Sequence, residues 1–113
     1  MSVDLDRLTE RADELWETSI LPSLSEFIEI EALSPGFEPD WKNKGELDSA
    51  IDLFSKWLVN QELDGMTYQI HRIDGRTPVL LVTVEGTGPG EVIFYSHLDK
   101  QPSRANLWSD GLH

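Results

Sequence analysis

The chain has 113 residues, of which 39% are hydrophobic, and 21 acidic against 9 basic residues give it a formal net charge of −12. This length suffices for one domain with a core, and the four tryptophans and four phenylalanines argue against disorder over the whole length. The negative charge disfavours nucleic acids and anionic membranes as partners, because they carry charge of the same sign.

Amphipathic helices are predicted in the first half of the chain. The first has apolar residues at three- and four-residue steps with charged residues between them: Leu5, Leu8, Ala12, Leu15, Trp16 and Ile20. Asp4 is its predicted N-cap, and Pro22 marks either a kink or the first turn of a second helical piece. A further helix with one apolar face is predicted from Leu47 to Leu58. These apolar faces are expected to lie against a sheet rather than to bind a ligand.

Residues 34–45 have the prolines, glycines and polar residues of a long loop. A plain linker would not need the two aromatic residues of this loop, Phe37 and Trp41. We expect both to pin the loop to the body of the protein, with contact to a substrate as the less favoured alternative.

Three strands are predicted after the helices, at residues 67–73, 79–84 and 91–95. Asp74 and Gly75 provide a hairpin turn that pairs the first two strands in antiparallel orientation. Residues 86–90 are glycine-rich, but a strand follows them rather than the helix that a phosphate loop requires, so they are interpreted as a turn. Because residues 92–95 are apolar on both faces, the third strand is expected inside the sheet. The fold class is therefore α/β, with helices followed by a mixed sheet.

His97 and Asp99 follow the third predicted strand and lie two residues apart. Alternation along extended backbone places both side chains on the same side. A carboxylate bonded to the second nitrogen of a metal-binding histidine fixes its tautomer and raises its basicity. The spacing alone favours a structural or solvated pair over a metal site. Since the chain contains no cysteine, any metal would be held by nitrogen and oxygen atoms.

Residues 95–102 (YSHLDKQP), followed by residues 108–112 (WSDGL), resemble the first metal motif of the dinuclear-zinc amidohydrolase family that includes carnosine dipeptidases, aminoacylases and carboxypeptidase G. Segments at 23–28, 34–35, 41, 52–58 and 74–79 are similar to the dipeptidase-like branch, so the resemblance covers nearly the whole chain. Ser96 departs from the pattern, because the family usually has glycine before the histidine.

This resemblance implies that residues 1–113 are the N-terminal portion of a helix–sheet–helix zinc-peptidase catalytic domain. His97 would bind one of two zinc ions, and Asp99 would be the catalytic-site residue that orients it; cobalt or manganese would suit the same ligands. In the family the other metal ligands and the general base follow this point, so the chain alone is expected to be inactive. The implied substrate is a peptide or an N-acyl amino acid, and a homodimer could form through a region outside this chain.

Two alternatives stay open. The chain could be a stand-alone acidic α/β interaction module, or a remnant of a decayed hydrolase, that keeps the fold without the chemistry. A metal-carrying peptide is the least favoured, because too few ligands are in view. We expect His71 to be exposed on a strand, and we assign no role to His113. Three further residues could line a cleft, but solvation is the simpler account of them: Lys100, Gln101 and Arg104. The lack of cysteine, of a signal peptide and of a membrane span favours the cytoplasm.

Overall fold

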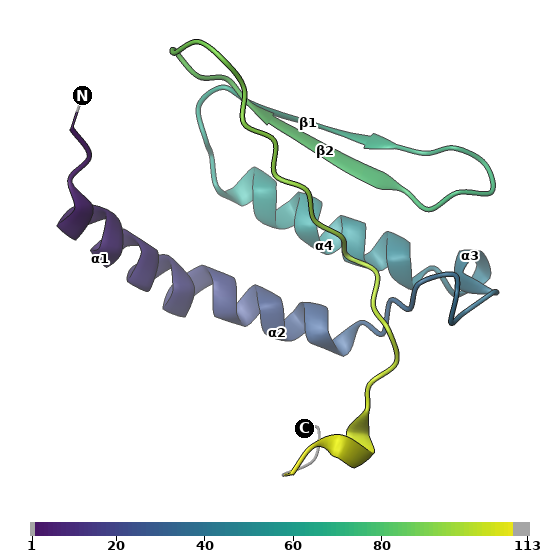
Figure 1. The fold of residues 1–113 in the computed structure, drawn as a ribbon. Coiled ribbons are helices and arrows are strands. Elements are labelled where there is room, and N and C mark those ends of the chain that lie inside the picture. The colour runs from purple at the N-terminus through teal and green to yellow at the C-terminus, as the bar shows by residue number, and fades with distance from the viewer. Residues whose placement is uncertain (1, 110–113) are drawn as a thin grey trace.

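The structure, a computed structural model, describes residues 2–109. Its elements in chain order are α1 (Leu5–Leu15), a π-helical turn (Trp16–Ile20), α2 (Leu21–Glu29), α3 (Trp41–Lys44), α4 (Glu46–Asn60), β1 (Met66–His71), β2 (Val79–Val84) and a 3-10 turn (Ala105–Leu107). In Figure 1, α1 and α2 follow each other as one long rod, and α4 lies between this rod and the β1–β2 hairpin. The α/β class is confirmed.

The first helix begins and continues as its sequence predicts. The Oδ1 atom of Asp4 accepts a hydrogen bond of 3.0 Å from the backbone N–H of Arg7, which satisfies one of the free donors of the first turn. Pro22, which has no backbone N–H, lies in the first turn of α2, directly after the π-helical turn. The apolar stripe of α1, however, does not lie against a sheet: Leu5 is 68% exposed and Leu8 is 56% exposed.

The small core lies where α2, α4 and the loop between them meet. Its buried cluster consists of Ala32, Leu47 and Ala50, with Phe27, Ile30 and Trp41 packed against it. The rings of Phe27 on α2 and Phe54 on α4 meet edge to face, with centroids 5.2 Å apart. The predicted apolar face of α4 is thus confirmed: it packs against α2, and α4 also lies beside the two-stranded sheet (Figure 1).

The loop before α4 is only partly as predicted. Trp41 packs against the core as expected, although it also begins the short helix α3. Phe37 is 55% exposed, so the expectation that it pins the loop is wrong. The loop is held instead by Glu38, whose Oε2 lies 2.6 Å from Nζ of Lys44 and whose Oε1 accepts a hydrogen bond from the backbone N–H of Asp40.

The predicted antiparallel hairpin is confirmed, with a register that runs from Met66 opposite Val84 to His71 opposite Val79. Its turn is closed by a hydrogen bond of 3.0 Å from the N–H of Arg76 to the carbonyl oxygen of Ile73.

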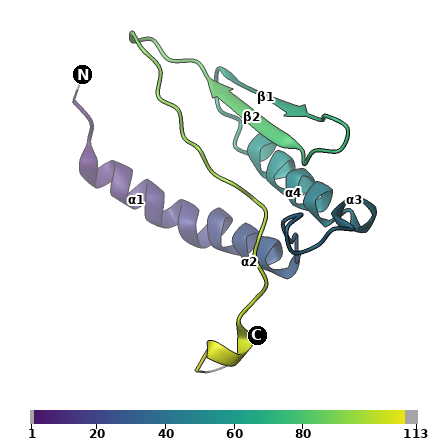
Figure 2. The ribbon, with the colours of Figure 1, turned by 45° about the vertical axis from the view of Figure 1, so that its right-hand side comes forward.

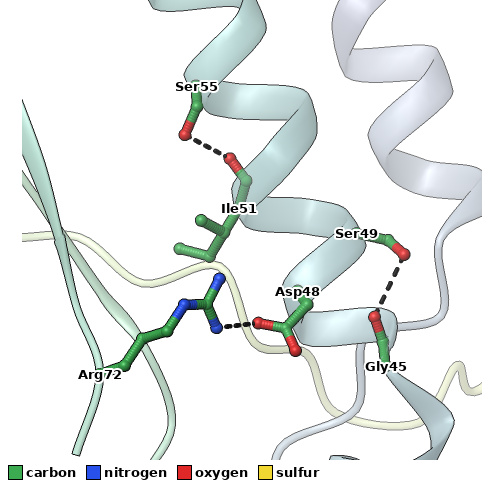
Figure 3. Close-up of polar contacts among 6 residues, drawn as sticks. All are labelled: Gly45, Asp48, Ser49, Ile51, Ser55 and Arg72. Carbon is green, nitrogen blue, oxygen red and sulfur yellow. Dashed lines mark hydrogen bonds and ion pairs between the residues drawn. The ribbon is translucent and has the colours of Figure 1, made fainter.

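Figure 3 shows the ion pair between Arg72, just after β1, and Asp48 on α4. In the same view the hydroxyl group of Ser49 donates to the carbonyl oxygen of Gly45, and that of Ser55 donates to the carbonyl oxygen of Ile51.

The third predicted strand is wrong for the part of the chain that the structure describes. The sheet has two strands, both antiparallel, and residues 91–95 run without a partner strand. Figure 2 shows this segment as a separate trace outside the β1–β2 hairpin. The side chains of residues 92–95 are 81–92% exposed. A strand that is apolar on both faces needs cover on both faces and a neighbour at each edge, and residues 2–109 provide no such place.

Gly45 joins α3 to α4 with a φ of 70°, a left-handed conformation that favours glycine. Gly45→Ala should therefore lower the free energy of unfolding by about 1 kcal/mol, although a Cβ atom would meet nothing within 4 Å. Gly86→Ala is the matched control, because Gly86 also has open space but no left-handed φ. Urea denaturation of both variants checks this, and equal effects at the two glycines would contradict it.

The Glu38–Lys44 pair should make stability depend on pH. The hydrogen bond from Lys44 and that from the Asp40 amide lower the pKa of Glu38. A lowered pKa in the folded state contributes stability that is present above the ordinary glutamate pKa and is lost as the pH falls through the folded value. The difference in melting temperature between the wild type and Glu38→Gln should thus shrink as the pH falls from neutral into the acid range. When Lys44→Met is added to both the wild type and Glu38→Gln, their difference in melting temperature at neutral pH should be smaller. A difference in melting temperature that does not depend on pH would contradict a stabilising Glu38–Lys44 pair.

Candidate metal site

His97 and Asp99 lie side by side at the end of the extended segment. The Nδ1 atom of His97 is 2.9 Å from Oδ1 of Asp99 and 2.9 Å from the carbonyl oxygen of the same residue. The spacing of two residues therefore brings the imidazole and the carboxylate together, as the alternation of extended backbone predicts. The imidazole is 70% exposed and the carboxylate side chain 38% exposed, so the pair faces solvent rather than an apolar interior.

The two contacts at Nδ1 define what the imidazole can do chemically. Both oxygen atoms are acceptors, so the neutral tautomer that satisfies them carries its hydrogen on Nδ1. In this tautomer Nε2 has a free lone pair, which is the form in which histidine binds metals. Asp99 contacts the nitrogen that would not bind the metal, as the carboxylate of a carboxylate–histidine–metal arrangement does. The geometry fits one nitrogen ligand together with the residue that orients it.

One ligand does not make a catalytic zinc site, which needs about three protein ligands. Among residues 2–109 no group of three or more histidine, cysteine, aspartate or glutamate side chains could hold a metal ion. His71 is exposed on β1, as predicted, and is not brought to the pair. Ser96 is exposed beside His97. His113 and residues 110–112 of the second part of the motif lie outside the described residues.

Lys100 is the residue of this region whose role sequence reasoning missed. Its Nζ donates to the carbonyl oxygens of Phe27 (2.6 Å) and Ile30 at the end of α2, and it lies 4.1 Å from the centroid of the Phe27 ring. Desolvation by burial lowers the pKa of this ammonium group. The expectation that Lys100 is solvated is therefore wrong. The sequence holds no signal that singles out Lys100, because α1, α2 and α4 all lack a basic residue in their last turn.

The backbone of Lys100 makes a second set of contacts. Its N–H donates to the carbonyl oxygen of Ala32 at 2.9 Å, and its carbonyl oxygen accepts from the N–H of Ser34 at 2.8 Å. These bonds form a parallel bridge between Leu33 and Lys100. The chain is thus attached to the core directly after the His97–Asp99 pair, since Ala32 is fully buried there.

Comparisons with known proteins leave the resemblance untested. No protein-family model matches the chain, and no curated protein matches it significantly. Membership of the zinc amidohydrolase family thus stays a prediction from the residues of the motif. Within residues 2–109, none of the helices has the length and apolar character needed to cross a membrane.

The contact between the pair can be tested by its effect on the imidazole tautomer. Nitrogen-detected NMR of the neutral His97 ring should show the hydrogen on Nδ1 in the wild type. In Asp99→Ala the carboxylate acceptor is gone, so the share of the tautomer with its hydrogen on Nε2 should rise. The ring of His71 is the internal control and should not change. Equal tautomer populations in wild type and Asp99→Ala would contradict the contact.

Proposed function

We propose that this chain supplies the first metal-ligand region of a zinc-dependent hydrolase that cleaves amide bonds, of dipeptidase type. In this proposal His97 binds zinc through Nε2, and Asp99 orients the imidazole. The observation that supports it is the 2.9 Å contact between Nδ1 of His97 and the Asp99 carboxylate, made by a ring that is 70% exposed.

The chemistry of such a site divides between the metal and the protein. Zinc supplies a Lewis acid that polarises an amide carbonyl group and lowers the pKa of a water molecule. His97 would hold the metal, and the negative charge of Asp99 would increase the electron donation of the imidazole and keep its plane fixed. The other ligands, the second zinc ion and the general base would belong to residues outside 2–109. Cobalt or manganese would suit nitrogen and oxygen ligands as well.

Exposed apolar surface supports the proposal that residues 1–113 are the N-terminal portion of a larger catalytic domain. The apolar stripe of α1 and residues 92–95 are both uncovered, which is costly for a finished domain. If residues 91–95 joined a sheet with strands at both edges, α1 could cover one face of that sheet. In this proposal the enzyme is cytoplasmic, acts on a peptide or an N-acyl amino acid, and dimerises, if at all, through a region beyond this chain.

A second candidate function, the acidic interaction module, is favoured by the same segment. An extended stretch with free backbone groups and exposed β-branched and aromatic side chains can add as a strand to the sheet of another protein. That module would have no use for a metal at His97. Zinc binding that depends on His97 therefore separates the two functions.

Calorimetric titration with zinc should show weak binding at one site of the purified chain, since only one protein ligand is in place. His97→Ala should abolish this binding. His71→Ala is the matched control, because it removes an exposed histidine that lies apart from the pair, and it should bind zinc as the wild type does. The chain alone should not hydrolyse dipeptides, because it lacks a complete ligand set.

Three results would overturn the proposal. Zinc binding that is equally weakened by both substitutions would show that His97 is no special ligand. Dipeptide hydrolysis that persists in His97→Ala would show that any activity comes from other residues. Absence of all zinc binding in the wild type would leave the interaction module as the better account.

A further inference from the structure

We propose that Lys100 is a positioning residue for the His97–Asp99 pair: it fixes the chain directly after the pair by docking its ammonium group and its backbone on the end of α2. The relevance to a metal rests on the proposed function, but the anchor itself exists without metal and can be tested in the metal-free chain. Lys100 would not touch the metal or the substrate.

The side-chain half of the anchor is a helix cap made by a residue distant in sequence. The last carbonyl groups of a helix have no partner within the helix, and they carry a partial negative charge. The Lys100 ammonium group donates to the carbonyl oxygens of Phe27 and Ile30 and reaches that of Ile28 at 3.4 Å; the Phe27 oxygen also accepts the N–H of Ile30. Hydrogen bonds from a charged donor are stronger than neutral ones, and the Phe27 ring adds a cation–π contact.

The backbone half of the anchor ties the segment to the core. Lys100 bonds through both its N–H and its carbonyl oxygen to the chain around Leu33, next to the fully buried Ala32. Residues 92–95, before the pair, have no comparable contacts, because they are at least 81% exposed and have no partner strand. The pair therefore lies at the boundary between a free segment and a fixed one.

This placement explains why Lys100 matters to the pair. Asp99 is joined to Lys100 by one peptide bond, so the anchor limits the positions that its carboxylate can take. The imidazole of His97 bonds both to that carboxylate and to the Asp99 carbonyl oxygen. Fixing Asp99 thus also fixes the ring, and a fixed ligand loses less conformational entropy when it binds. Without the anchor the pair would continue a segment that has no partner strand among residues 2–109.

The test compares Lys100→Met with Lys56→Met, which removes an exposed lysine from α4. Lys100→Met keeps an apolar side chain of similar length but removes the donors. Hydrogen exchange by NMR should show that the amides of Lys100 and Ser34 lose about tenfold in protection, the factor for loss of one charge-assisted hydrogen bond. The ring nitrogen shifts of His97 should move towards those of the exposed His71. Lys56→Met should change neither, and Lys100→Arg should restore most of both.

Each outcome of this test bears on the anchor. Unchanged protection in Lys100→Met would overturn it. Lost protection with unchanged His97 ring shifts would show a cap that does not position the pair, which also overturns the proposal. If Lys100→Met also lost protection in α4, it would be unfolded, and Lys100→Gln, which keeps an N–H donor group, would replace it under the same criteria.

Zinc titration separates this proposal from the proposed function. If the wild type binds zinc through His97, Lys100→Met should bind it more weakly although Lys100 is no ligand, and Lys56→Met should bind as the wild type does. Equal zinc binding by Lys100→Met and the wild type would overturn the positioning role and leave the function of His97 intact. No zinc binding by the wild type would remove the function, while the exchange and ring measurements would still decide the anchor.

Discussion

The packing of Phe27 is the interaction on which the rest of the described structure depends. Its ring meets Phe54 of α4 edge to face, and its other contacts are with the small buried cluster around Ala50. The same residue receives the Lys100 ammonium group at its carbonyl oxygen and over its ring. Phe27 therefore joins three parts of the chain: α2, α4 and the segment that follows His97.

Two expectations failed for one physical reason. The stripe of α1 was expected to cover a sheet and residues 91–95 to lie within one, yet both are exposed. Apolar surface of this extent is stable only when something buries it. The β1–β2 hairpin cannot do so, since it contacts α4 and has only two strands. Residues 2–109 leave both surfaces uncovered, and the proposed wider sheet, with residues 91–95 as a strand and α1 as its cover, would bury them.

Patterns within short segments of the sequence predicted the features that depend on contacts within those segments. Period and capping residues placed the helices, including the Asp4 cap, and the Asp74–Gly75 turn set the hairpin. The contact of His97 with Asp99 followed from a spacing of two residues. The exposure of Phe37 and the cap by Lys100 were not predictable in this way. Lys100 bonds to a carbonyl group 73 residues earlier, and no periodicity within a segment encodes such a contact.

The position of the pair between a fixed and a free segment has a thermodynamic consequence for the proposed function. Residues 92–95 have no partner strand among residues 2–109, and pairing with one would restrain His97 from the side opposite to Lys100. A metal that prefers the ordered ring would in turn favour the paired state of the segment, because coupling between two binding events is reciprocal. Metal binding and completion of the sheet would then stabilise each other. If the proposed function holds, the site would be weak in residues 1–113 and tight in a completed domain, because the number of ligands and the order of the segment would both be greater there.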